Sequence, residues 1–346
     1  MSTIKDVAKL AEVSPSTVSI VLNSAESDRR ISPSTRKRVL KAVQKLDYRP
    51  SITARRLRME EPSIPTIALF WPLDSRGSVA GELLACIHRA FTCSYFDCEL
   101  ITCSFENDRL KDLAALKNSR FDGAIIGSTS EADMMYLKES PPRAPVVLYN
   151  RELENYHSVV GDNVMAGKMA AELLHRRDHK RVGVYTFTSP PPATKLRCTS
   201  FMRRCDELGI QAEIICRETS FAQFDEVIAA TEQMIKSGNV PKAIVLANDS
   251  TSFSVVSCLM RAGYRIPEDV EILCTVPATG KIGRNLRPSI TQIVFPLEDM
   301  LTDCVNILIH AISHHITVPI NKIYAPQIVY GDSMPEPDGI VQKNGG

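Results

Sequence analysis

The sequence predicts two fold classes in one chain: an all-α head at the N-terminus, followed by an α/β core of two parallel, doubly wound sheets. Residues 3–23 and 31–46 have the apolar spacing of short helices. Residues 1–60 hold 13 Lys and Arg against 6 Asp and Glu, a net charge of +7, whereas the other 286 residues sum to −6. From residue 64 onward, short apolar runs alternate with amphipathic helical patterns, which is typical of parallel sheets.

The first helix is expected to begin near Ile4, with Thr3 as its N-cap. Asp6 lies three residues after Thr3, and such a capping box satisfies the free N–H groups at a helix start. The apolar residues from Ile4 to Ala11 then follow helical spacing and form one narrow stripe.

The second and third helices each begin with a serine followed by a proline. Ser14 and Pro15 start the second helix, and Ser32 and Pro33 start the third. Serine is a preferred N-cap, and proline is tolerated at the first helical position because its missing N–H would be unpaired there anyway. Two short helices joined by a tight turn predict a DNA-binding helix-turn-helix. A helical bundle with a solvated basic face is the alternative interpretation.

A longer motif supports the first interpretation. The pattern Ile-x-Asp-Val-Ala-x-x-Ala-x-Val-Ser-x-x-Thr-Val-Ser runs from Ile4 to Ser19, and Tyr48-Arg49-Pro50 follows the third helix. These residues resemble the lactose-repressor (LacI) family of bacterial transcription regulators, densely over residues 3–57 and more sparsely beyond. The resemblance implies a cytoplasmic homodimer on near-palindromic operator DNA, more often a repressor than an activator. It also implies a two-lobed core like that of periplasmic binding proteins, which holds a small-molecule effector, a sugar or another metabolite.

The segment after Pro50 is too short to form a stable helix alone, because helix nucleation is costly. The resemblance implies a hinge helix that orders on DNA, in which Leu57 wedges between bases, Ala54 packs nearby and Arg55 meets phosphate. An ordinary charged linker is the alternative. Ile20 stands where the family often has arginine, so contact with a thymine methyl is expected there instead of guanine recognition. The full set of expected DNA-contacting residues is Thr3, Ser14, Pro15, Ser16, Thr17, Ser19, Ile20, Asn23, Arg30, Ser32, Thr35, Tyr48, Ser51, Ala54, Arg55 and Leu57.

In the core, ligands of open α/β sheets bind at the carboxyl ends of strands. The candidate effector-binding residues follow the predicted strands directly: Trp71, Pro72, Asp74, Arg76, Asn150, Arg197 and Asn248. By resemblance, Arg197 and Asn248 hold effector hydroxyls or carboxylates, and a helix-start arginine and a turn-forming Asn-Asp pair are the plain alternatives. The family's sugar-gripping carboxylate is replaced by Val276, and its Asn-Pro-Phe-Phe motif by residues 73–77, although Trp71 could replace the lost aromatic platform. A sugar is therefore not the default effector.

The expected domain boundaries follow the same patterns. Five segments are predicted: a head over 1–50, a hinge and linker over 51–63, a first core lobe over 64–161 with 295–322, a second over 162–294 with 323–332, and a disordered tail over 333–346.

Other patterns limit the function. We expect no cofactor and no metal, because the ten cysteines and the i, i+4 pairs His175/His179 and His310/His314 lack a ligand signature. We also expect no membrane span, because no apolar stretch approaches the length that a span needs and the N-terminus lacks the apolar core of a signal peptide. Nucleotide-binding and hydrolase motifs are missing, which argues against an α/β enzyme. A solute-binding transport protein, or a regulator without a small-molecule effector, remain as rival functions.

Overall fold

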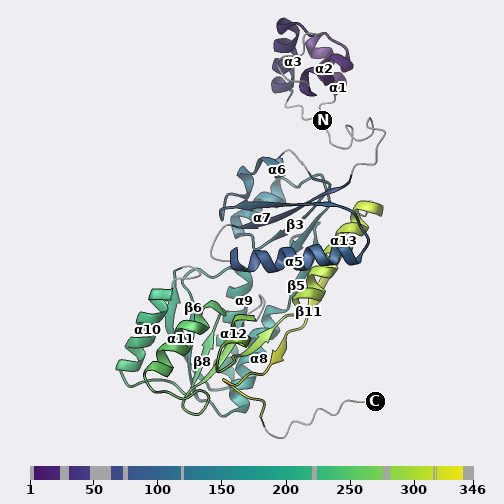
Figure 1. The fold of residues 1–346 in the computed structure, drawn as a ribbon. Helices are drawn as coiled ribbons and strands as arrows, with labels where there is room; N and C mark the ends of the chain where they lie inside the picture. The colour runs from purple at the N-terminus through teal and green to yellow at the C-terminus, as the bar shows by residue number, and fades with distance from the viewer. Residues whose placement is uncertain are drawn as a thin grey trace, which may run out of the picture. The chain divides into compact units, whose positions relative to one another are not determined.

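The computed structural model describes residues 4–23, 31–46, 64–72, 77–117, 121–219, 224–275, 281–314, 316 and 318–337. The chain divides into two compact units, a head with the first three helices and a core with both sheets (Figure 1). Among the described residues, none of the helices is both long and apolar enough to span a membrane.

The head consists of α1 (Ile4–Ala11), α2 (Pro15–Asn23) and α3 (Pro33–Lys45). All three helices contribute small apolar side chains to one core, whose buried members are Val7, Ala8, Ala11, Val18, Val21, Val39 and Ala42. The predicted serine caps are confirmed, since Ser14 Oγ accepts from the N–H of Thr17 at 3.1 Å and Ser32 Oγ accepts from the N–H of Thr35 at 3.2 Å.

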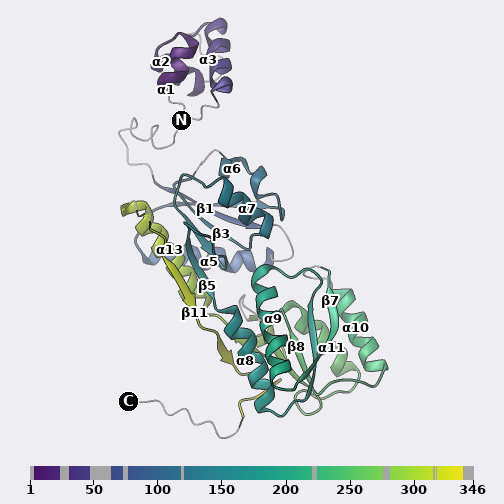
Figure 2. The same cartoon turned by 180° about the vertical axis from the view of Figure 1, so that it is seen from behind.

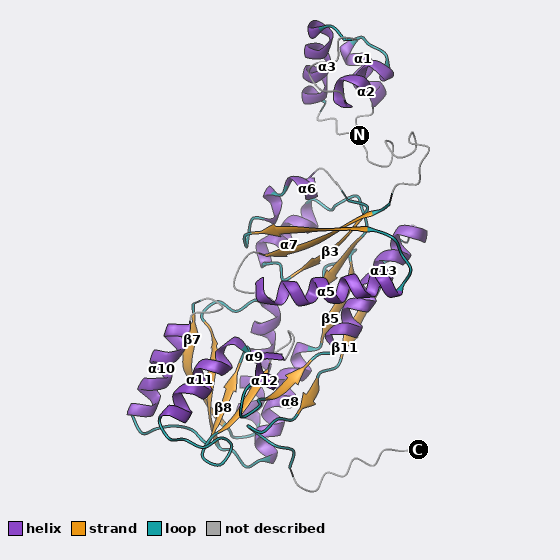
Figure 3. Cartoon of the chain, in the orientation of Figure 1, coloured by secondary structure: helices purple, strands orange, loops and turns teal. Residues whose placement is uncertain are grey.

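The first sheet of the core has six strands in the order β11-β5-β4-β3-β1-β2, and every neighbouring pair is parallel (Figure 3). We call the part built on this sheet the N-lobe. Its strands are β1 (Thr66–Pro72), β2 (Glu99–Phe105), β3 (Gly123–Gly127), β4 (Val146–Tyr149), β5 (His157–Gly161) and β11 (Asn321–Tyr324).

Helices cover both faces of the first sheet. The N-lobe helices are α5 (Gly77–Cys93), η1 (Leu110–Asp112), α6 (Ala114–Lys117), α7 (Glu131–Glu139) and α13 (Leu297–His314). Leu69 on β1 belongs to the same apolar cluster as Leu83 on α5 and Leu301 on α13, whereas the next residue, Phe70, clusters with Leu137 on α7. Because side chains alternate along a strand, α5 and α13 lie on one face and α7 on the other.

The second sheet has six strands in the order β12-β10-β9-β8-β6-β7. We call the part built on it the C-lobe. Its strands are β6 (Arg181–Phe187), β7 (Gln211–Glu218), β8 (Ala243–Leu246), β9 (Glu271–Thr275), β10 (Thr291–Val294) and β12 (Gln327–Val329). Its helices are α8 (Asn163–Arg176), α9 (Pro192–Glu207), α10 (Phe224–Lys236), α11 (Ser250–Arg261) and α12 (Lys281–Asn285). In Figure 2, α8 and α9 lie on the opposite side of this sheet from α10 and α11. The expectation of an all-parallel sheet is wrong at one edge, because β12 pairs antiparallel with β10.

The chain passes between the lobes three times: from β5 to α8, from β10 to α13 and from β11 to β12. The strands approach closely at the first passage, where a Cβ on Gly161 would lie 2.6 Å from the ring of Phe295. The last passage falls later than the expected boundary between 322 and 323, since β11 keeps residues through Tyr324 paired with β5.

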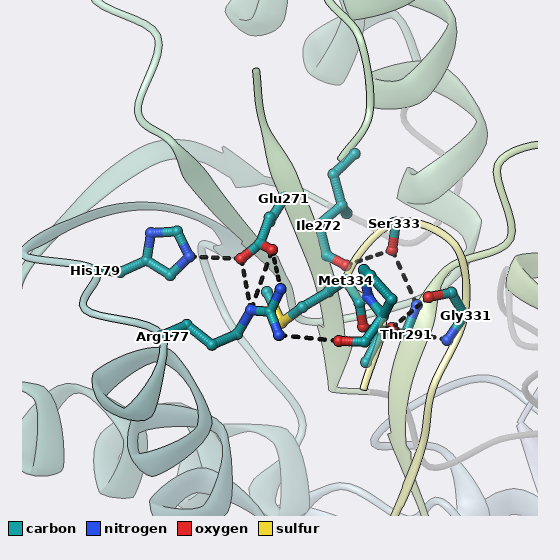
Figure 4. Close-up of polar contacts among 9 residues, drawn as sticks. Arg177, His179, Glu271, Ile272, Thr291, Gly331, Ser333 and Met334 are labelled. Carbon is teal, nitrogen blue, oxygen red and sulfur yellow. Dashed lines mark hydrogen bonds and ion pairs between the residues drawn. The ribbon is translucent and has the colours of Figure 1, made fainter. Parts of the chain in front are cut away.

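The C-terminal segment is held to the C-lobe by buried hydrogen bonds (Figure 4). Ser333 Oγ donates to the carbonyl of Ile272 at 2.6 Å and accepts from the N–H of Thr291 at 3.0 Å. Thr291 Oγ1 donates to the carbonyl of Met334 at 2.6 Å, and the Met334 side chain is buried. The expectation of a disordered tail from residue 333 is therefore wrong for residues 333–337, because these polar groups complete the hydrogen bonding at a sheet end. Residues 338–346 lie outside the described part.

Candidate functional site

The exposed start of α2 is held in one conformation by its own hydroxyls. Ser14 Oγ and Thr17 Oγ1 lie 2.9 Å apart, in addition to the cap that Ser14 provides. Ser14, Pro15 and Ser16 are exposed and Thr17 is half-buried, whereas Val18 is fully buried on the opposite side. The predicted DNA-contacting residues 14–17 thus form one short polar surface, and Ile20 lies half-buried one turn further along the helix.

The start of α3 has the same construction. Ser32 Oγ lies 2.8 Å from Thr35 Oγ1 and caps the helix, so the two predicted residues of this helix contact each other. Lys37, Lys41 and Lys45 are exposed along α3 and keep the head positively charged.

Several predicted residues cannot be placed. Thr3, Arg30, Tyr48, Ser51, Ala54, Arg55 and Leu57 lie outside the described residues, as do Asp74, Arg76 and Val276. Ser19 and Asn23 lie within α2, but their side chains are outside the described part of the structure.

The predicted residues at the end of β1 are buried. Trp71 is 5% exposed and its ring centroid lies 6.4 Å from that of Tyr149 on β4. A Cβ on Gly127 would lie 2.5 Å from the Trp71 ring, so the glycine allows the ring to pack there. Trp71 Nε1 has no hydrogen-bond partner among the described residues. Pro72 is buried beside it at the strand end.

Asn150 lies directly after β4 with a φ of 54°, a conformation that asparagine tolerates better than most residues. Its Oδ1 accepts from the N–H of Gly161 at 3.3 Å, so its side chain reaches the first passage between the lobes. The neighbouring Arg151 donates from Nε to the carbonyl of Thr129 at 2.7 Å, which supports a structural role.

Arg197 lies in the second turn of α9 and is 2% exposed. Its Nη1 donates to Asn163 Oδ1 at 2.8 Å and its Nη2 donates to the carbonyl of Ala247 at 3.4 Å. Ala247 directly follows β8, so the guanidinium lies at the carboxyl edge of the second sheet. Burial lowers the pKa of Arg197, because the charged form loses its hydration.

Asn163 is a functional candidate that the sequence reasoning missed. It is the first residue of α8, is 7% exposed, and donates from Nδ2 to the carbonyl of Gly161 at 3.0 Å. Asn150, Gly161, Asn163 and Arg197 therefore form a continuous chain of hydrogen bonds from the N-lobe, through the first passage, to the C-lobe. The Asp162-Asn163 pair after a strand was visible in the sequence, but its partner is 34 residues away.

Asn248 points toward a second missed residue, Glu218 at the end of β7. Asn248 Nδ2 donates to Glu218 Oε1 at 3.1 Å, and Thr251 Oγ1 donates to the same oxygen at 3.0 Å. Asn248 Oδ1 accepts from the N–H of Thr251 at 3.1 Å and also from the hydroxyl of Ser250. Burial raises the pKa of Glu218 to about 7, although the bonds from Thr251 and Asn248 oppose the shift. Asn248 thus has the predicted turn role, through its bond with the N–H of Thr251, and it also contacts Glu218 at the end of β7.

The paired histidines make other contacts. His179 Nε2 lies 2.6 Å from Glu271 Oε2, and Glu271 also binds Arg177 (Figure 4). His310 and His314 are exposed with ring centroids 4.5 Å apart. Within the described ranges, no group of three or more His, Cys, Asp or Glu side chains could hold a metal ion.

Comparison with known protein families gives one match in the head and another in the core. Residues 3–51 match the model of bacterial regulatory proteins of the lacI family, and residues 171–334 match a periplasmic binding protein-like domain. The ribose operon repressor of Escherichia coli strain K12 is 25% identical over 323 residues, which cover 90% of this chain and 94% of that protein.

Two solved structures are similar along most of their length. A LacI family transcription regulator from Clostridium acetobutylicum is 26% identical with a TM-score of 0.71, and the match covers 77% of this chain and 99% of that one. The lac repressor dimer bound to operator and the anti-inducer ONPF is 19% identical with a TM-score of 0.68, over 97% of this chain and 99% of that one, which shows the shared fold. The chain therefore combines a lacI-family region over residues 3–51 with a periplasmic binding protein-like domain over residues 171–334.

Proposed function

We propose that the protein is a transcriptional repressor that binds a near-palindromic operator as a homodimer and responds to a small-molecule effector. The observation that carries this proposal is the construction of α2. Its caps and buried Val18 and Val21 fix the helix, while the polar residues 14–17 remain at the surface. A recognition helix needs a rigid backbone and short polar side chains at its exposed start, because the base edges lie deep in the major groove.

The proposed DNA contacts divide into three groups. Residues of α2 read base edges, the start of α3 with Ser32 and Thr35 positions the head on phosphates, and the segment 51–58 enters the minor groove with Leu57. The head carries a net charge of +7 over residues 1–60, which favours the phosphate backbone over any neutral ligand.

We further propose that the effector binds where the carboxyl edges of the two sheets meet, in contact with Arg197 and with Asn150 and Asn248 on either side. Trp71, Pro72, Asp74 and Arg76 are the proposed N-lobe contacts. The chain of hydrogen bonds through Asn163 supports a link between this site and the angle of the lobes. The effector then changes operator affinity by as much as its affinity differs between two lobe arrangements.

The remaining parts of the proposal follow from this role. The domain boundaries that we propose are a head to residue 50, a hinge over 51–63, and lobes that exchange chain at the three passages. We infer a location in the bacterial cytoplasm, where operator DNA lies, and a role without catalysis, since the similar proteins are described as repressors and regulators.

A selection experiment tests the DNA-binding proposal. The full-length protein is incubated with a pool of random duplexes, and bound DNA is amplified and sequenced over several rounds. Enriched duplexes should contain two half-sites related by a two-fold axis, and their affinity should fall steeply with salt concentration. A pool without enriched half-sites, together with weak binding that salt does not change, would contradict the proposal and favour a solute-binding role.

A further inference from the structure

Strand β11 leaves one edge of the first sheet open. In the described part of the chain it pairs with β5 on one side and with no strand on the other (Figure 2). The carbonyls of Ile320 and Tyr324 accept hydrogen bonds from the β5 side at 3.0 and 2.8 Å. Because backbone groups alternate in direction along a parallel strand, the N–H and C=O groups of Asn321 and Ile323 point away from β5. Such an open edge is a template for a further strand.

The two faces of β11 differ. On one face, Lys322 forms an ion pair with Asp303 on α13 at 2.6 Å, and the hydroxyl of Tyr324 also binds Asp303. Lysine often protects an open edge from pairing, but here its charge is used by Asp303. Asn321 and Ile323 lie on the face turned away from α13, because side chains alternate along a strand. The Ile323 side chain is 66% exposed, so an apolar group stands uncovered beside the free edge.

A pocket of about 390 Å³ opens on the same face. It is lined by the loop of residues 152–155, by Pro319 and Asn321 around the start of β11, and by Ser158 on β5. Ser158 is 1% exposed, and its hydroxyl donates to Asn321 Oδ1 at 2.8 Å, so both strands hold the base of the pocket. Ser158 and Asn321 lie at the starts of their strands. The pocket is therefore at the opposite edge of the sheet from the proposed effector site.

The pocket has an unbalanced negative charge. Glu152 and Glu154 both line it and both are exposed. Within the described ranges, neither carboxylate forms an ion pair or a hydrogen bond, and Lys322 on the neighbouring strand is directed to Asp303 on the other face. The other side chains that line the pocket are neutral. A lysine or arginine side chain complements this pocket, because it supplies the charge and the donors that the two carboxylates lack.

We propose that this surface binds an extended segment of a partner protein that carries a lysine or an arginine. The segment adds a strand to β11 through the backbone groups of Asn321 and Ile323, and its basic side chain enters the pocket toward Glu152 and Glu154. In strand addition, backbone hydrogen bonds supply affinity and a side-chain pocket supplies specificity. Ile323 and Val318, which is 72% exposed, add apolar contact after and before the pocket residues of this segment.

Peptide selection on the full-length protein tests which segment binds. The probe is a displayed library of random short peptides, and a fluorescent copy of a selected peptide then gives the Kd by anisotropy. The selected peptides should share a lysine or arginine, with β-branched or aromatic residues at alternate positions around it. Selected peptides without a shared basic residue overturn the proposal.

Charge reversal tests the pocket. In the double variant Glu152→Lys with Glu154→Lys, affinity for the selected peptide should fall by about tenfold or more, and a peptide with glutamate at the basic position should bind better than the original. The control, Glu99→Lys with Glu106→Lys, makes the same change of net charge at exposed residues around β2, the other edge strand of this sheet. It should bind like the wild type. Equal weakening by both double variants would be a general effect of charge and would overturn the proposal.

Ile323→Pro tests the free edge. Proline removes an N–H that does not pair with β5, and it is tolerated at such positions of an edge strand. Peptide affinity should fall by about two- to tenfold, the effect of one hydrogen bond, at an unchanged Tm. Ile323→Val keeps the N–H and should bind like the wild type. Unchanged affinity of Ile323→Pro at an unchanged Tm overturns strand addition.

Two further measurements decide the remaining outcomes. If the Tm of Ile323→Pro falls, a selected peptide that is N-methylated at alternate residues removes the same hydrogen bonds from the other partner, and its affinity for the wild-type protein must then be lower. Sedimentation velocity compares the assembly of the wild-type protein and Ile323→Pro without peptide. A smaller assembly in the variant shows that a second copy of this chain occupies the edge, which overturns the proposal of a separate partner.

Discussion

Lys281 on α12 forms an ion pair with Glu82 on α5 and thereby joins the C-lobe to the N-lobe. Lys281 is 68% exposed and Glu82 is 24% exposed, so water screens the pair and its contribution to stability is small, about 0.2–1 kcal/mol. Its importance lies in position, because it connects a C-lobe helix to an N-lobe helix in addition to the three chain passages.

Glu82→Gln should loosen the arrangement of the lobes with little change in the free energy of unfolding. Amide hydrogen exchange should become faster at residues 161–163, where the first passage lies, and the difference should shrink at high salt. The matched control is Glu298→Gln, which breaks the pair with Arg89 within the N-lobe and should leave exchange at the passage unchanged. Equal exchange in the two variants would show that the pair does not hold the lobes.

Glu271→Gln should destabilise the C-lobe by about 3 kcal/mol at neutral pH. Glu271 is 13% exposed and binds both Arg177 and His179, so its loss leaves a largely covered arginine, 15% exposed, without its counter-charge. Burial alone would raise the pKa of Glu271, but the hydrogen bonds from His179 and Arg177 outweigh it and hold the pKa below its ordinary 4.5.

The sign of the pH effect follows from that shift. The stabilisation by Glu271 is fully present above pH 4.5 and is lost as the pH falls through the lower folded pKa. Urea unfolding of both proteins at several pH values should therefore show a gap that closes in acid. Glu213→Gln is the control, because Glu213 pairs with Arg181 at a half-exposed site and should cost less.

Glu218→Gln should remove a pH dependence of the opposite sign. The folded pKa of about 7 exceeds the ordinary 4.5, so the folded protein holds the proton more tightly and loses stability as the pH rises between these values. Between these pH values, Glu218 should lower the free energy of unfolding of the wild-type protein by about 3 kcal/mol, and this loss should be missing in the variant. Parallel urea-unfolding profiles of the two proteins from pH 5 to 7 would contradict the assignment.

Gly167→Ala should separate α8 from α9. The added Cβ would lie 2.3 Å from the backbone oxygen of Arg197, so the helices must move apart at a cost of about 1–3 kcal/mol. Gly81→Ala in α5 is the control: nothing described lies within 4 Å of its Cβ, and alanine should stabilise the helix by about 1 kcal/mol. Thermal unfolding should move in opposite directions for the two variants.

Ser14→Ala and Ser16→Ala should separate folding of the head from DNA recognition. Ser14 caps α2, so its loss should destabilise the head by about 1 kcal/mol. The Ser16 side chain is exposed and makes no hydrogen bond within the described part of the chain, so its loss should weaken operator binding with little change in head stability. Circular dichroism of unfolding and anisotropy with a selected operator measure the two effects.

The local features of the fold were predictable from sequence, and the distant ones were not. The caps at Ser14 and Ser32 were correct because both partners lie within three residues. The antiparallel edge strand β12 and the burial of Ser333 were missed because both depend on β10, some forty residues earlier. The polar composition of this segment predicted a disordered tail, but Ser333 forms hydrogen bonds with backbone groups of Ile272 and Thr291 inside the C-lobe.

The candidate site divides in the same way. Asn248 could be singled out because it follows a predicted strand, and Arg197 because of its resemblance to the family's arginine, whereas their partners Asn163 and Glu218 could not. Asn163 is a polar residue at the start of α8, and Glu218 is a polar residue at the end of β7. Their roles arise only when crossovers bring two strand ends together, and one sequence does not contain that geometry.

The order of the chain has a consequence for synthesis. Residues 66–161 supply five strands of the N-lobe sheet, but its edge strand β11 and its covering helix α13 come only after the whole second sheet except β12. While the ribosome makes the C-lobe, α5 is already present on this face, but the apolar part that α13 will cover, which includes Ile125 and Val147, remains uncovered. A nascent chain of this protein therefore needs protection from aggregation until residue 314 has emerged. A ribosome that stalls earlier leaves five strands of the sheet with part of their apolar face exposed.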